Sequence, residues 1–179
     1  MIFGFDSAVV YTAIVVLVAL ERLYEMVIGR RNLKRALSRG GQVYGKGHWP
    51  WMVVLHTTFL IACPLEVWVA ERPFVAAQFW GFGALVVCTM TLRYWVISTL
   101  GDRWNPQIVV VPNDKRIDTG PFRFLPHPNY LAVVIELFAL PMMHGAWGVA
   151  VFYGLANGLL LRTRIREEER VLRSELRTT

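Results

Sequence analysis

Residues 74–100 read FVAAQFWGFGALVVCTMTLRYWVISTL, an apolar run whose one charged residue is Arg93. About 20 mostly apolar residues are enough to cross a bilayer as a helix. Similar runs cover residues 8–28 and 49–70, and two shorter ones cover residues 130–143 and 147–161. The short joint between the last two predicts a helical hairpin. The sequence therefore predicts an all-α integral membrane protein with about five transmembrane helices.

The composition supports this class. The chain has 179 residues, of which 55% are hydrophobic and 18% charged, against about 25% charged in an average soluble domain. Such a composition excludes a disordered or coiled-coil chain. Both cysteines, Cys63 and Cys88, lie inside apolar runs and have neither zinc-ligand nor disulfide-framework spacing. We expect a single membrane domain over residues 1–179 and no metal site.

The basic residues predict an orientation. Of the 19 Lys and Arg, 16 lie in three segments, residues 30–48, 101–129 and 162–179. Five crossings would put all three segments on one side, and the positive-inside rule makes that side cytoplasmic. The N-terminus would then face outward. Because these charges flank membrane spans and form no separate basic face, we expect no nucleic-acid partner.

A loop rich in Gly and Pro covers residues 101–129, and a loop this long in a compact chain is usually functional. It ends in His127-Pro128-Asn129-Tyr130. Pro128 suits the first turn of a helix, and the N-terminus of that helix can bind a carboxylate or a phosphate. From the residues alone, a rigid proline-rich turn with a capping histidine is the simpler interpretation.

The charged segment 162–172 continues the fifth apolar run. Arg164 and Glu168 are four residues apart, so they can pair on one face of a helix. A solvated helix end is the simpler interpretation of such a run. The predicted hairpin, however, would bring Glu168 back beside His127 and Tyr130, where a cationic ligand with a carboxylate tail would fit.

These motifs carry a resemblance. The segments GPFR (120–123), HPNY (127–130) and RIREEERVL (164–172), together with Leu100-Gly101 and Trp104, resemble the isoprenylcysteine carboxyl methyltransferase family. Its members are integral membrane enzymes that use S-adenosylmethionine. The resemblance implies an S-adenosylmethionine-dependent methyltransferase, with a cytoplasmic cofactor-binding loop and C-terminal helix in residues 101–179 and a substrate side in residues 1–100.

The residues and the resemblance together predict roles; the resemblance itself implies that His127, Tyr130, Glu168 and Glu169 hold the cofactor. Arg164 and Glu168 are expected to act on the acceptor. Trp104, Arg123 and Glu25 are expected on the substrate side. The expected cofactor-binding residues are Gly120, Pro121, His127, Pro128, Tyr130, Glu168 and Glu169.

The N-terminal half resembles a bacterial branch of the family that accompanies type III polyketide synthases. The matching segments are ERLYE (21–25), RN (31–32), RGG (39–41) and HWP (48–50). The expected substrate is a lipophilic alkylpyrone or alkylresorcinol enol or phenol, or a prenylcysteine-like carboxylate, and the expected partner is a polyketide synthase pathway. Pro126 replaces the Arg that precedes His-Pro in the family, and Arg123 is a candidate substitute.

Three alternatives remain open. A phospholipid N-methyltransferase would use the same cofactor. An NADPH-dependent membrane reductase has a similar H-P-x-Y segment, although Glu168 and Glu169 would repel its phosphates. A membrane scaffold or channel subunit would bind nothing at the loop.

Polar residues inside the apolar runs are expensive in a membrane and are therefore candidates for function. They are His56, Glu66, Arg93 and Glu136. We expect Glu136 either to contact substrate or to pair with Arg93. Gly154 and Gly158 form a GxxxG pattern, which predicts close helix packing.

Overall fold

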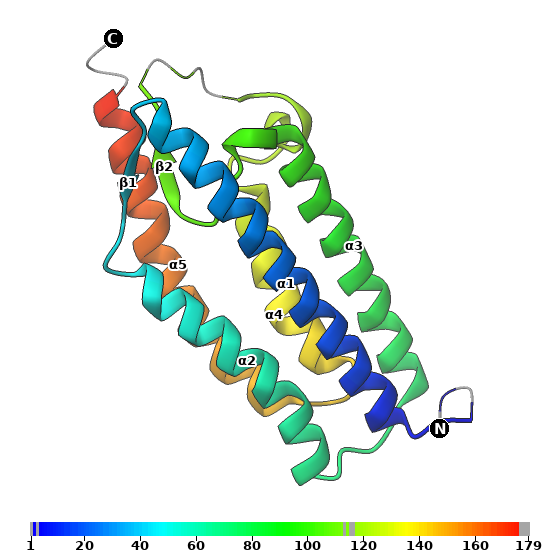
Figure 1. Ribbon diagram of the computed structural model, residues 1–179. Coiled ribbons are helices and arrows are strands. Elements are labelled where there is room, and N and C mark those ends of the chain that lie inside the picture. The colour runs from blue at the N-terminus through cyan, green and yellow to red at the C-terminus, as the bar shows by residue number, and fades with distance from the viewer. Residues whose placement is uncertain (1, 3, 113, 115–116, 176–179) are drawn as a thin grey trace.

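The computed structural model describes residues 2, 4–112, 114 and 117–175 (Figure 1). Its helices are α1 (Ser7–Ser38), α2 (Trp49–Val69), α3 (Ala76–Leu100), α4 (Pro128–Met142) and α5 (Trp147–Glu175). Two short strands, β1 (Gln42–Tyr44) and β2 (Ile108–Val110), pair antiparallel, and residues 101–103 and 120–123 form 3-10 turns. The described chain is therefore predominantly helical, as the sequence predicts.

Three helical stretches are long and apolar enough to cross a membrane: Ser7–Ser38, Trp49–Val69 and Ala76–Arg103. Their outer surfaces carry exposed aliphatic side chains such as Leu17, Ile61 and Val87, which suit contact with lipid. α4 is apolar but shorter. The protein is therefore a multi-pass membrane protein.

Helix ends follow local signals in the sequence. The Asp6 side chain caps α1 by accepting a hydrogen bond from the Ala8 N–H at 2.7 Å. α3 ends at Gly101, which has φ +52°, and α4 begins with Pro128 at the position where a missing N–H costs least. Gly145, with φ +72°, lies in the turn of the α4–α5 hairpin.

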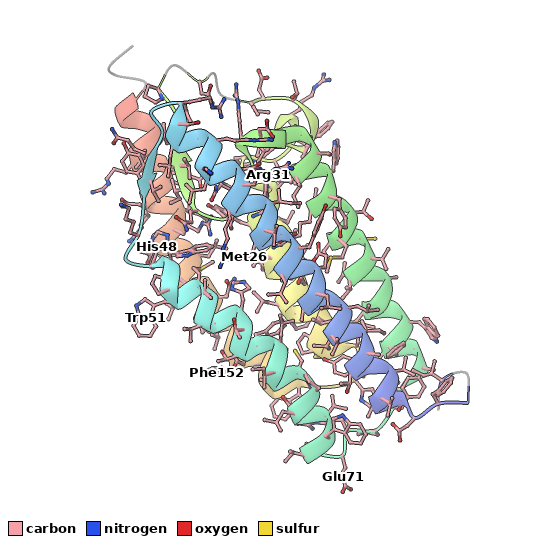
Figure 2. The ribbon with its side chains drawn as sticks, in the orientation of Figure 1. Met26, Arg31, His48, Trp51, Glu71 and Phe152 are labelled. Atoms are coloured by element: carbon pink, nitrogen blue, oxygen red, sulfur yellow. The ribbon has the colours of Figure 1, made fainter. Side chains whose placement is uncertain are left out.

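α3 packs along α4, and α5 packs against both α4 and α2 (Figure 1). The core contains Tyr11, Phe59, Cys63, Val86 and Leu140, which come from α1, α2, α3 and α4. At one end of the bundle, the β1–β2 ribbon lies between the ends of α1 and α5, and the turn at residues 120–123 packs against α3 (Figure 1). Figure 2 shows Arg31 and His48 toward this end and Glu71 at the opposite one.

Glu66 caps a helix from within another helix. The Gly148 and Val149 N–H groups at the start of α5 donate to the two Glu66 carboxylate oxygens at 3.2 and 2.7 Å. Arg72 donates to the same carboxylate at 2.6 Å. A negative charge at a helix N-terminus is stabilising, so this residue fastens α2 to the α4–α5 hairpin.

Glu66→Gln should lower the stability of the bundle, because the amide has no charge and only one accepting atom. The expected cost is about 1–3 kcal/mol, which corresponds to a melting temperature lower by several degrees in detergent. Glu71→Gln, in the exposed turn after α2, is the matched control. Equal melting temperatures for the two variants would contradict the capping role.

A second polar cluster joins α1, α3 and α4. Arg93 donates to both oxygens of Glu25, at 2.6 and 3.1 Å. Arg22 donates to Glu25 at 2.8 Å and to Glu136 at 3.2 Å. Arg93 also lies 3.9 Å from Glu136, which confirms that these two residues are close. Its distances to Glu25 are shorter, so Glu25 is the principal partner of Arg93. Buried charges in a membrane protein pair in this way because an isolated one is costly.

The packing prediction for the GxxxG pattern is wrong. Gly154 and Gly158 are exposed, and a Cβ added at either would meet no atom within 4 Å among the described residues. α5 contacts its neighbours through another face, which includes Val149, Ala150 and Asn157.

Candidate active site

A cavity of about 770 Å³ lies at the loop end of the bundle. Its wall combines the end of α1, the last turns of α3, described residues of the loop between Asp102 and Asp118, the start of α4, and two side chains of α5, Arg164 and Glu168. Pockets of about 300–1,000 Å³ are typical of small-molecule sites. We call this cavity the chamber.

The loop is fastened to α1. The Asn32 amide nitrogen donates to the carbonyl oxygens of Gly101 and Trp104, at 3.1 and 2.8 Å. The Asn105 amide nitrogen donates to the Gly29 carbonyl at 3.0 Å. Close approach requires glycine at position 29, since an added Cβ would stand 2.5 Å from the Pro106 side chain. These contacts fix the α1 side of the chamber.

Strand β2, which pairs with β1, forms a further part of the wall. Val43 faces Val109 and Tyr44 faces Ile108 in the antiparallel register, and Ile108 to Val111 line the chamber. The sequence predicts an extended piece at Val109–Val111, and β2 confirms it within one residue. It does not identify β1 as the partner, because the two strands are more than 60 residues apart.

Tyr130 connects α4, α5 and the loop. Its hydroxyl donates a short hydrogen bond to Glu168 and accepts one from Arg164 Nε at 2.9 Å. Arg164 Nη2 donates to the Pro106 carbonyl at 2.6 Å. The expected contact between Arg164 and Glu168 is therefore indirect, because the Tyr130 hydroxyl stands between them.

His127 packs against the same tyrosine. Its ring stacks on the Tyr130 ring at 5.3 Å between centroids, and the Arg164 guanidinium lies 5.2 Å from the same ring. His127 Nε2 is 3.8 Å from a Glu169 carboxylate oxygen. His48, at the start of α2, lies outside the chamber. Burial and the positive charge of Arg164 hold the pKa of His48 below its usual value.

The structure separates the predicted site residues into two groups. Those that line the chamber are Trp104, His127, Pro128, Tyr130, Arg164 and Glu168. Those outside its described lining are Glu25, Gly120, Pro121, Arg123 and Glu169.

The second group has other surroundings. The Glu25 carboxylate binds Arg22 and Arg93. Gly120 packs on α3, where an added Cβ would meet the Thr99 side chain at 2.4 Å. The neighbouring Pro121 is buried, and Arg123 is exposed.

Asn32, Asn105 and Asn129 also line the chamber but do not appear among the predicted site residues. The oxygens of Asn32 and Asn129 are buried and have no hydrogen-bond partner among the described residues. Buried polar atoms are normally paired, so these oxygens are suited to receive a ligand's donors. Asn32 and Asn129 lie in the segments RN (31–32) and HPNY (127–130) that carry the resemblance, but the resemblance gives neither asparagine a role.

These groups fit S-adenosylmethionine. Its ammonium group could pair with Glu168, and its carboxylate suits the N-terminus of α4. No cluster of three or more potential metal-ligating His, Cys, Asp or Glu side chains occurs among the residues that could be searched.

Comparison with known proteins decides the family. Residues 82–174, more than half of the chain, match the Isoprenylcysteine carboxyl methyltransferase (ICMT) family. The chain belongs to this family. The family is one of membrane methyltransferases, which supports an enzymatic role for the chamber. No solved structure matches the chain significantly.

Two relatives extend the similarity beyond the family match. YpbQ of Bacillus subtilis (strain 168) is 28% identical over 160 residues, which cover 89% of this chain and 94% of YpbQ. A protein of Haemophilus influenzae (strain ATCC 51907 / DSM 11121 / KW20 / Rd) is 26% identical over 149 residues, which cover 83% of this chain and 86% of that protein. Both are named as uncharacterized proteins, so neither indicates a substrate.

Gly29→Ala tests how the loop is fastened. Inside a helix, Gly→Ala normally stabilises by about 0.5–1 kcal/mol. At position 29 the added methyl would collide with Pro106, so the melting temperature should fall and proteolysis of residues 101–111 should accelerate. Gly154→Ala, in open space on α5, should show neither change. A Gly29→Ala protein as stable as the wild type would contradict close contact between loop and helix.

Proposed function

We propose that the protein transfers a methyl group from S-adenosylmethionine to an oxygen of a lipophilic acceptor. The observation that carries the proposal is the Tyr130–Arg164–Glu168 arrangement in the wall of the chamber. The family match supports the reaction class. The acceptor is an alkylpyrone or alkylresorcinol enol or phenol, or a prenylcysteine-like carboxylate.

Charge complementarity supports the binding mode. The cofactor's ammonium group would bind at Glu168, with Glu169 adding negative charge beside His127. Its carboxylate would lie at the start of α4, near Pro128 and Asn129. The same acidic pair disfavours NADPH, whose phosphates it would repel.

S-adenosylmethionine would supply a methyl group on a positively charged sulfur. As the acceptor oxygen forms its bond to the methyl carbon, the carbon–sulfur bond would break, and S-adenosylhomocysteine would leave with the electron pair. The protein contributes mainly by holding donor and acceptor collinear. Arg164, fixed by Tyr130 and the Pro106 carbonyl, would orient the acceptor oxygen through its positive charge. A carboxylate acceptor needs no base. A phenol must lose its proton, for which Glu168 and His127 are the candidates.

The lining of the chamber supports a lipophilic acceptor. Val96, Leu100, Val110 and Phe122 supply apolar surface beside the polar groups. Phe124 is 71% exposed and contacts Trp95 on α3, so the loop carries aromatic surface at the level of the α3 end. An acceptor with an alkyl chain would enter from the bilayer. The N-terminal resemblance makes a type III polyketide synthase pathway the proposed source of that acceptor.

The chamber would open to the cytoplasm. In the five-span topology, the basic segments 30–48, 101–129 and 162–179 would lie on the same side of the membrane as the chamber. The positive-inside rule makes that side the cytoplasm. The N-terminus would then be external.

Methyl transfer is tested with S-adenosylmethionine labelled in its methyl group and detergent-purified protein. The acceptors are an alkylpyrone, an alkylresorcinol and phosphatidylethanolamine. We expect label in the oxygen acceptors and none in the phospholipid. Glu168→Gln should lower kcat/KM about 10- to 150-fold, as loss of a charged hydrogen bond would.

Glu167→Gln is the matched control, because it makes the same charge change one residue away, where the side chain binds Arg170. Its kcat/KM should stay near the wild-type value. Labelled phosphatidylethanolamine would instead support the N-methyltransferase alternative, and no labelled product with folded protein would contradict the proposal.

A further inference from the structure

In the side-chain amide of Asn32, the nitrogen is hydrogen-bonded to the described part of the protein and the oxygen is not. Its nitrogen donates to the Gly101 and Trp104 carbonyls, which identifies the remaining atom as the oxygen and fixes its orientation. The side chain is 2% exposed. Its oxygen has no hydrogen-bond partner among the described residues, and Asn32 lines the chamber.

Asn105 provides a direct comparison within the same loop. Its nitrogen donates to the Gly29 carbonyl at 3.0 Å, and its oxygen accepts from the Gln107 N–H at 2.9 Å. Asn105 also lines the chamber. Both asparagines therefore attach the loop to α1. Of the two, only Asn32 has a side-chain oxygen that accepts no hydrogen bond from the described residues.

The surroundings of Asn32 define the donor that it can receive. Ala36, Val96, Leu100 and Trp104 also line the chamber, with mostly apolar side chains, and Asn32 is hydrogen-bonded to the backbone of Gly101 and Trp104. A charged ammonium group would prefer the carboxylate of Glu168 to a neutral amide in such surroundings. The free oxygen is thus suited to a neutral group that donates and does not need to accept.

We propose that Asn32 reads the adenine base of the cofactor, with its side-chain oxygen accepting a hydrogen bond from the adenine 6-amino group. This rests on the proposed use of S-adenosylmethionine. The 6-amino group is neutral and donates without accepting, and the flat base suits apolar walls that include Trp104. Asn32 would therefore be a binding residue contributed by α1, outside the segment 82–174 that carries the family match.

The test compares two non-reactive ligands by calorimetry. One is S-adenosylhomocysteine, and the other is its analogue with a 6-oxo group in place of the 6-amino group. A site that hydrogen-bonds a donor rejects a ligand that lacks it, because a buried acceptor is left unpaired. The wild-type protein should bind the oxo analogue about 5- to 150-fold more weakly.

The variants Asn32→Ala and Asn105→Ala distinguish recognition of the adenine base from attachment of the loop to α1. If a substitution only loosens the attachment of the loop, the affinity for both ligands falls by the same factor, and the ratio of their dissociation constants is unchanged. Asn105→Ala should behave in this way. Asn32→Ala should bring the ratio close to one.

Three outcomes would overturn the inference. They are equal binding of the two ligands by the wild type, an unchanged ratio in Asn32→Ala, and a ratio that collapses equally in Asn105→Ala. If Asn32→Ala does not fold, the wild-type ratio still decides. Failure of the folded wild type to bind S-adenosylhomocysteine at all would count against the proposed function itself, and would remove the basis of the inference with it.

Discussion

The chamber depends on one hydroxyl group. Tyr130, in the first turn of α4, donates to Glu168 and accepts from Arg164, both on α5, while Arg164 reaches the Pro106 carbonyl in the loop. Three segments distant in sequence are held by this single side chain. The hairpin makes this possible, because it returns α5 to the end of the bundle at which α4 begins. Without the hydroxyl, the Arg164 guanidinium and the Glu168 carboxylate would be free to form a direct pair, and Arg164 would keep only the Pro106 carbonyl as a partner that orients it.

The opposite wall is built by different means. α1 holds the loop through two asparagine amides and through Gly29, whose missing side chain lets Pro106 approach. The two walls meet at the Pro106 segment, which contacts α1 on one side and Arg164 on the other. Deeper in the bundle, Glu25, Arg93, Arg22 and Glu136 connect α1, α3 and α4. α1 and α3 are therefore part of the structure of the chamber.

The apolar runs predict the helices because the length and the hydropathy of a membrane span can be read directly from a single sequence. The four-residue spacing places Arg164 and Glu168 on one face, but it cannot show that a tyrosine from another helix would stand between them. The β1–β2 pairing and the Asn32 contacts are long-range and have no local pattern. The GxxxG pattern predicts a packed face that the fold leaves exposed, because small residues permit close packing without requiring it.

Binding of S-adenosylmethionine by the Tyr130-centred chamber is the central claim, and calorimetric titration of purified wild-type and Tyr130→Phe proteins tests it most directly. We predict saturable binding of S-adenosylmethionine to the wild type and no binding of NADPH. Affinity for S-adenosylmethionine should be about tenfold lower in Tyr130→Phe, as loss of one hydrogen bond to a charged group predicts. Binding of NADPH instead, or equal affinity of both folded proteins for S-adenosylmethionine, would contradict the account.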